Sequence, residues 1–320
     1  MITILTEPIP PPRQYYTDNV KGRLRPLLRK LDGREPLKRP AYGGHFAVTR
    51  SLVEGLRKAG LPFVYNPRRI KDCTPDLIAL SGLQTLEQAI GLRKAGIVKR
   101  LAAGPNIVGS PADNFELLGS EWIERYIVNS DWTRNMYAGE LPSLDAKLII
   151  WPAGVDEEYW KPEGREKDPR SLLFYSKRPD KELFDRCIEI AEAAGCRVTV
   201  LEYGSYTPPQ YKQLLNEHAI LVHFTPSESQ GISLAESWSV DVPTLVWNQG
   251  VYVSHGKTIP CSSAPFLSDP TGLFFRDAPE FAAALDKAVS APAAFSPRKW
   301  ILDHLTDEIS ARHLIQLLEF

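Results

Sequence analysis

Two glutamates, Glu228 and Glu236, stand eight residues apart with Gly231 between them. The apolar run 219–224 before them predicts a buried parallel strand, and 232–240 has helical spacing. Glu228 would therefore follow the carboxyl end of a strand, where open α/β sheets bind ligands. Both oxygens of a carboxylate accept hydrogen bonds, so the pair suits the neighbouring hydroxyls of a sugar. A helix cap with one dipole-compensating glutamate and one exposed glutamate would explain the same residues.

The backbone between the two glutamates has the features of an anion site. Ser229 to Ser233 would offer free N–H groups at the N-terminus of a helix, where the helix dipole also favours negative charge. Gly231 lets the backbone approach a ligand without a side chain in the way. The segment thus combines groups for hydroxyls with groups for an anion.

The elements that must position this segment alternate between short apolar strands and amphipathic helices. This alternation favours parallel sheets covered by helices, the α/β class. The predicted strands are 1–5, 62–65, 76–80, 99–103, 106–109, 122–129, 148–151, 171–175, 197–202, 219–224 and 244–247. The predicted helices are 46–59, 86–95, 181–194, 209–217, 232–240, 280–290 and 297–320. A proline-rich, basic excursion at 8–40 holds one further short helix around 20–31.

The length of 320 residues predicts two domains, because single cores stop growing near roughly 250–300 residues. The polar, proline-bounded segment 162–169 is the best linker, and the strand–helix alternation restarts after it. We expect domains at 1–163 and 164–296, with 297–320 as a final helical segment. Ligand sites favour such domain interfaces.

Composition narrows the class of protein. The apolar fraction of 43% and charged fraction of 24% are ordinary for a soluble globular chain. A net charge of −1 gives no overall field for nucleic acid or an anionic membrane. We find neither a signal peptide nor an apolar run of about 18 residues, and the four cysteines lack metal-site spacing. These features favour a cytoplasmic protein.

Four segments resemble motifs of one protein family, and they occur along the chain in the same order as in that family. They are Gly43-Gly44 before a helix, 128–133 (VNSDWT), 152–162 (PAGVDEEYWKP) and Glu228-x7-Glu236 followed by Val242-Pro243. Together they are similar to motifs of the large E-x7-E family of retaining GT-B glycosyltransferases (glycosyl transferases group 1). The resemblance runs from about residue 41 to 295. It implies two Rossmann-like domains with an interdomain cleft, and a C-terminal helix at 297–320 that crosses back to the first domain.

The resemblance also implies roles for individual residues. Glu228 would contact the donor sugar and hold the reacting centre, and Glu236 would bind the ribose. Lys177 and Lys181 would neutralise the charge of the donor diphosphate, and Arg178 is the alternative cation for this role. Further donor-side residues would be Gly44, Tyr203, Gly204, Ser229, Gln230, Gly231, Ile232, Ser233 and Leu234, while Gly43 and His45 would face the acceptor.

Simpler interpretations of three of these features stay open at this point. The basic turn 177–181 also fits a solvated surface, Tyr203 an exposed aromatic, and His45 a structural position. The chain departs from the family pattern where Ala153 replaces an asparagine and Asp241 a glycine. The family's histidine at the end of a first-domain strand has no counterpart in 78–82.

The function implied is retaining transfer of a hexose from a nucleoside-diphosphate sugar to a glycan or lipid-linked acceptor. A lipid-linked acceptor would bring peripheral contact with a membrane. We expect no cofactor and no metal, since no D-x-D motif ends a strand. The main alternative is a GT-B-like protein that binds a nucleotide or glycan without transfer. An epimerase on the same fold is less favoured, and a nicotinamide dehydrogenase least, because no G-x-G-x-x-G follows the first strand.

Overall fold

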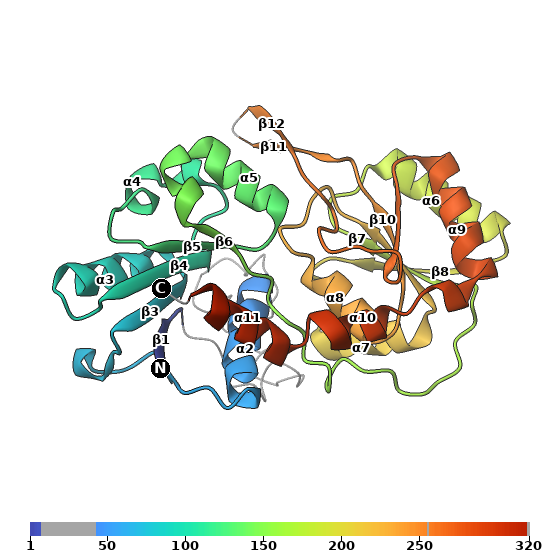
Figure 1. Ribbon diagram of the computed structural model, residues 1–320. Helices are drawn as coiled ribbons and strands as arrows, with labels where there is room; N and C mark the ends of the chain where they lie inside the picture. The colour runs from blue at the N-terminus through green and yellow to red at the C-terminus, as the bar shows by residue number, and fades with distance from the viewer. Residues whose placement is uncertain (8–42, 255, 319–320) are drawn as a thin grey trace, which may run out of the picture.

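The computed structural model describes residues 1–7, 43–254 and 256–318, which form two parallel sheets covered by helices (Figure 1). The expected short helix around 20–31 lies outside the described residues. The first sheet has six strands in the order β2-β1-β3-β4-β5-β6. Their bounds are β1 Ile2–Leu5, β2 Phe63–Tyr65, β3 Asp76–Ser81, β4 Arg100–Asn106, β5 Arg125–Val128 and β6 Leu148–Ile150.

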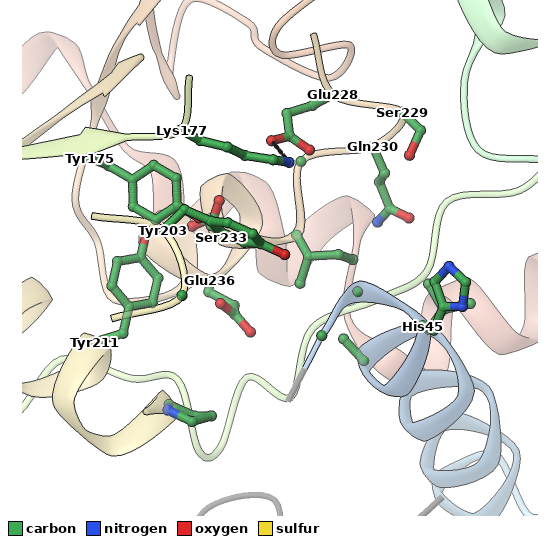
Figure 2. A pocket seen from close by; sticks show the side chains of 18 of the residues that line it. His45, Tyr175, Lys177, Tyr203, Tyr211, Glu228, Ser229, Gln230, Ser233 and Glu236 are labelled. Atoms are coloured by element: carbon green, nitrogen blue, oxygen red, sulfur yellow. Dashed lines mark hydrogen bonds and ion pairs between the residues drawn. The ribbon is translucent and has the colours of Figure 1, made fainter. Parts of the chain in front are cut away.

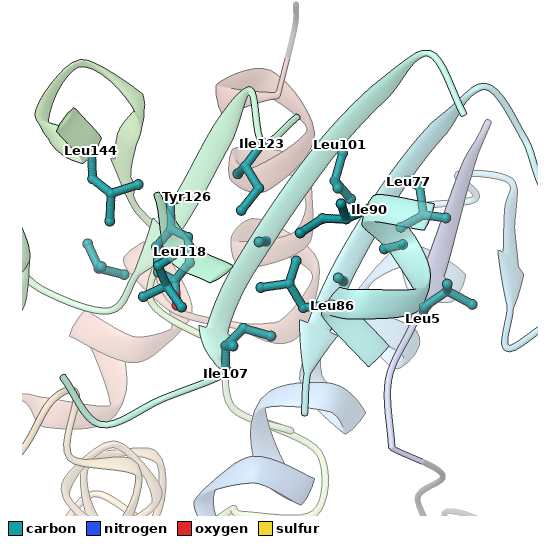
Figure 3. Packing of buried hydrophobic residues seen from close by; sticks show 14 of the residues in the cluster. Leu5, Leu77, Leu86, Ile90, Leu101, Ile107, Leu118, Ile123, Tyr126 and Leu144 are labelled. Atoms are coloured by element: carbon teal, nitrogen blue, oxygen red, sulfur yellow. The ribbon is translucent and has the colours of Figure 1, made fainter. Parts of the chain in front are cut away.

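Helices cover both faces of this first sheet. Leu86 and Ile90 of α3 pack on Leu77 and Leu101 of the strands, which gives one core layer (Figure 3). The other face buries Leu52 and its neighbours on α2. The helices are α2 Gly44–Lys58, α3 Leu83–Lys94, α4 Phe115–Leu118 and α5 Asp131–Glu140, with short 3₁₀ turns at Ile70–Asp72, Pro111–Asp113 and Pro142–Lys147.

The second sheet has five strands in the order β13-β10-β9-β7-β8. Its strands are β7 Ser171–Ser176, β8 Arg197–Glu202, β9 Ile220–Phe224, β10 Thr244–Trp247 and β13 Gly272–Phe275. Its helices are α6 Lys181–Ala193, α7 Pro208–Glu217, α8 Ile232–Ser239 and α9 Ala278–Ser290, followed by a 3₁₀ turn at Pro292–Ala294. An antiparallel hairpin, β11 Val251–Ser254 and β12 Lys257–Pro260, projects from it (Figure 1).

Two local predictions were wrong. The Gly104-Pro105 break does not separate two strands, because both residues lie within one strand, β4, which runs from Arg100 to Asn106. The final segment is not one helix but two, α10 Pro297–His304 and α11 Asp307–Leu317. Between them, Thr306 forms a parallel bridge with Val155 and its hydroxyl caps α11 by accepting from the Ile309 N–H at 3.2 Å.

Helix α11 crosses back to the first domain, as expected, and lies against α2 (Figure 1). The two helices touch closely at Gly55, where an added Cβ would lie 2.1 Å from the carbonyl oxygen of Asp307. Beside this contact, the buried Arg50 and Asp307 side chains form an ion pair at 2.5 Å. The exact domain boundaries stay a prediction.

The chain passes between the two domains twice, and the two passages are hydrogen-bonded to each other. The Val155 N–H donates to the Leu305 carbonyl and the Asp307 N–H donates to the Val155 carbonyl, both at 3.0 Å. Gly154 makes this approach possible, because a Cβ there would lie 2.4 Å from the Thr306 carbonyl oxygen. In the described part of the chain, no helix is both long and apolar enough to cross a membrane.

Candidate functional site

A pocket lies between the two domains and encloses about 1000 Å³, part of it open to solvent. The first domain contributes the start of α2 and the ends of β4 and β5, and the second contributes loops after β7, β8 and β9. Parallel strands bring these loops together because their carboxyl ends meet at one edge of each sheet. The predicted residues that line the pocket are Gly43, Gly44, His45, Lys177, Tyr203, Gly204, Glu228, Ser229, Gln230, Gly231, Ile232, Ser233 and Glu236.

Three predicted residues do not line it. Lys181 is 82% exposed and pairs with Asp185 at 2.5 Å on the outer face of α6. Arg178 occupies the left-handed region, φ 53°, in the turn before that helix. Leu234 is buried in the core, and its N–H is bonded to the Gly231 carbonyl at 3.1 Å. The structure therefore does not bring Lys177 and Lys181 together at the pocket.

Lys177 and Glu228 meet inside the pocket. β7 and β9 are adjacent parallel strands, so the residues that follow them lie side by side. Lys177 Nζ lies 2.8 Å from Glu228 Oε1, and the two side chains point toward one another (Figure 2). The same ammonium group is 4.9 Å from the centre of the Tyr203 ring. Both charges are thus held facing the pocket.

The backbone of Glu228 is fixed from two sides. Its N–H donates to the Ser262 carbonyl at 3.0 Å, and its own carbonyl accepts from Trp132 Nε1 at 2.9 Å. Trp132 belongs to the first domain, on α5, so this bond ties the loop before α8 to the opposite domain. The carboxylate position consequently depends on how the two domains sit together.

The start of α8 is open toward the pocket. Gly231 precedes it in the left-handed conformation, φ 84° and ψ 61°, and no side chain caps the helix. Among the residues that the structure describes, the N–H groups of Gly231, Ile232 and Ser233 have no acceptor. Uncapped N–H groups at a helix N-terminus suit an anion.

Glu236 lies one turn further along α8 and is only 6% exposed. Its carboxyl group has no hydrogen-bond partner within the described ranges. Burial raises the pKa of this carboxyl to about 8, although the positive charge of Arg50 opposes the shift. A buried acid that faces a pocket without a partner is suited to the hydroxyls of a ligand.

An aromatic wall completes the second-domain side, and the sequence interpretation found only Tyr203 of it. The Tyr206 hydroxyl donates to the Tyr175 hydroxyl at 3.0 Å, and Tyr211 donates to the Ser233 carbonyl at 2.9 Å. His223 stacks behind Tyr175, and burial lowers the pKa of its imidazole to about 3, so the ring is neutral. In the sequence, only Tyr203 and Tyr206 in the loop after β8 could have indicated this wall.

Gln230 connects the loop before α8 to the first domain. Its side-chain oxygen accepts from the Ala153 N–H at 2.9 Å and from Asn129 Nδ2 at 3.3 Å, while its nitrogen donates to the Ala153 carbonyl at 2.5 Å. His45 lies across the pocket at the start of α2 (Figure 2). Within the described ranges, no three His, Cys, Asp or Glu side chains are grouped to hold a metal.

Two Rossmann-like α/β domains facing one pocket, with a C-terminal helix returning to the first, define the GT-B fold. Neither a family model nor a curated protein matches the sequence. The similarity to solved structures is clear, however, and at these low identities it establishes the fold alone.

HepE of Anabaena, solved with UDP, matches with a TM-score of 0.60 and 10% identity, over 86% of this chain and 96% of that one. The lipopolysaccharide outer core galactosyltransferase WaaB matches with a TM-score of 0.55 and 12% identity, over 86% and 95%. The pneumococcal O-GlcNAc transferase GtfA, solved with UDP and GlcNAc, gives a TM-score of 0.51 and 12% identity over 76% of this chain. This chain spans only 56% of the GtfA chain.

Proposed function

We propose that this protein is a retaining glycosyltransferase that moves a hexose from a nucleoside-diphosphate sugar to a glycan or lipid-linked acceptor. Its structural neighbours support the donor class, because HepE and GtfA were solved with UDP and WaaB is a galactosyltransferase. A lipid-linked acceptor would place the protein in peripheral contact with a membrane.

The observation that carries the proposal is the joint position of three features in one pocket. Glu228 and Lys177 form an ion pair, the open start of α8 lies beside them, and the unpartnered Glu236 lies one turn deeper. In a donor complex Glu228 would accept hydrogen bonds from the sugar hydroxyls. The α8 N–H groups and Lys177 would contact the diphosphate, and Glu236 the ribose.

This arrangement suits departure of a diphosphate. The bond from the anomeric carbon to the diphosphate oxygen breaks, and negative charge grows on the leaving group. Fixed N–H dipoles and the Lys177 ammonium stabilise that charge without a metal or a cofactor. The acceptor oxygen forms the new bond on the face that the diphosphate leaves, and its proton passes to the leaving group. Because the leaving diphosphate takes up the proton of the acceptor, this step needs no carboxylate as a general base.

The test begins with ligand binding. Nucleoside diphosphates with uracil, guanine, adenine and thymine are screened for a rise in melting temperature, since a ligand of the native state stabilises it. The matching sugar nucleotides are then assayed for turnover with and without EDTA, and the anomeric configuration of the product is determined by NMR. Failure of every diphosphate to stabilise the protein would contradict the proposal.

A second candidate, binding without transfer, is favoured by one observation. Lys181 and Arg178 do not line the pocket, and Lys177 already pairs with Glu228, so little positive charge faces a diphosphate within the described ranges. Stabilisation by a sugar nucleotide, with neither transfer to a panel of acceptors nor hydrolysis, would support this candidate instead.

A further inference from the structure

Two asparagines end neighbouring strands of the first sheet, and both line the interdomain pocket. Asn106 is the last residue of β4, and Asn129 directly follows β5. The strands pair in parallel, so both side chains stand at the same edge of the sheet. Neither was singled out as a ligand residue from the sequence.

The two amides differ in their hydrogen bonds. Asn129 donates to Gln230 at 3.3 Å and so helps to fix the loop before α8. The Asn106 side chain has no partner among the described residues, and its Nδ2 atom is fully buried. Only the backbone of Asn106 is engaged, where its carbonyl accepts from the Gly82 N–H at 3.1 Å.

A buried amide donor without a partner is unfavourable in a folded protein. Nearly all such groups bond to protein, to water or to a ligand. Asn106 lies in the wall of a pocket and the residue as a whole is only partly buried, so rotation of its amide would bring the nitrogen to an acceptor on a bound ligand. The amide is neutral and offers both a donor and an acceptor, which matches a hydroxyl better than a phosphate.

We propose that Asn106 hydrogen-bonds a hydroxyl of the transferred sugar and thereby determines which sugars are accepted. This inference rests on the proposed function. Asn106 belongs to the first-domain wall, whereas Glu228 and the start of α8 belong to the second-domain wall. Because Asn106 lies in the part of the wall formed by the ends of the first-domain strands, we assign its partner to the sugar held in the pocket and not to the acceptor. The sugar would then contact both domains at once.

The test compares affinities for a diphosphate and for its sugar derivatives. Wild type and Asn106→Ala are titrated calorimetrically with UDP, UDP-glucose and UDP-galactose, or with the equivalents of whichever base the screen selects. We expect Asn106→Ala to bind UDP as wild type does and the preferred sugar nucleotide about 5- to 15-fold more weakly. The preference between glucose and galactose, which differ in one hydroxyl orientation, should shrink in the same variant.

Asn129→Ala is the matched control, because Asn129 acts through Gln230 and the loop that holds the diphosphate. It should weaken UDP and UDP-sugars by the same factor. If alanine at 106 prevents folding, Asn106→Ser gives the same comparison, since its shorter side chain withdraws the amide.

Each other result has a definite meaning. Equal weakening of UDP and UDP-sugar by Asn106→Ala, or no weakening of either, would overturn the role of Asn106 while leaving the proposed function intact. If wild type binds no diphosphate at all, the proposed function fails first and the inference falls with it.

Discussion

Lys177 Nζ and Glu228 Oε1 lie 2.8 Å apart, with the two side chains 26% and 15% exposed. This pair is partly shielded from water, so its charges interact more strongly than those of a surface pair. A diphosphate entering the pocket would compete with Glu228 for the same ammonium group. If the proposed function holds, the ion pair would therefore couple recognition of the sugar to recognition of the phosphate.

Glu228→Gln should separate these two functions. We expect sugar transfer to fall at least about 100-fold, because the carboxylate proposed to position the sugar loses its charge. UDP affinity should rise about 3- to 10-fold, because Lys177 is released from its partner. Turnover assays and calorimetry measure the two effects, and Lys181→Ala should change neither, since Lys181 is 82% exposed outside the pocket. Unchanged turnover in Glu228→Gln would refute the role assigned to this residue.

Glu236→Gln should change how stability depends on pH. Burial raises the pKa of Glu236 to about 8, so the folded protein retains a proton that the unfolded chain releases near pH 4.5. Wild-type stability should therefore decline as pH rises from 4.5 to 8, whereas glutamine adds no such decline. The variant should match wild type near pH 4.5 and exceed it by on the order of 3–5 kcal/mol at pH 8. Urea unfolding across this range tests the prediction, and parallel pH curves would disprove it.

Gly55→Ala should loosen the contact between α2 and α11. The new methyl group would meet the backbone of Asp307, which cannot move without separating the helices. We expect a loss of about 1–3 kcal/mol in the free energy of unfolding. Gly91→Ala on α3 is the control, because nothing lies within 4 Å of its Cβ position. It should instead gain about 0.5–1 kcal/mol from helix propensity, and equal effects of the two changes would count against the close contact.

Asp307→Ala should leave the buried Arg50 guanidinium without its carboxylate. The side chains are 3% and 0% exposed, so we expect a cost of about 3–5 kcal/mol by chemical denaturation. Arg50→Met/Asp307→Leu removes both charges and should recover most of that loss. Hydrogen exchange should show faster opening of α11 in the single variant only. A single variant as stable as wild type would show that the pair does not hold this helix.

The sequence was most informative where local pattern and packing agree. The strand before Glu228 is apolar except for His223 because β9 is covered on both faces, and all five of its residues are buried. Helix α2 has a clear apolar stripe because one side faces the sheet. The same patterns failed for β13 at Gly272–Phe275, which is short and partly exposed. They also failed for β12, where none of the four residues is buried and no alternation is imposed.

The candidate site was harder to predict because side-chain direction depends on helix geometry. Asp180 caps α6 through the Leu183 N–H at 3.1 Å, and this sets the helix so that Lys181 points outward to Asp185. Spacing alone could not distinguish that outcome from a pair facing the diphosphate. The missing hydrogen-bond partner of the Asn106 side chain could not be predicted either. A sequence shows that a residue ends a strand, but not whether its side chain has a partner.

The hydrogen bonds that join Val155 to Leu305 and Asp307 bear on whether the second domain can be removed or exchanged. They place the entry and exit of the second domain side by side, so residues 156–304 are arranged as an insert within the first domain. Domains with adjacent ends tolerate excision, replacement and transplantation. The second domain could therefore be exchanged for another of the same fold, while the first domain and helix α11 are kept.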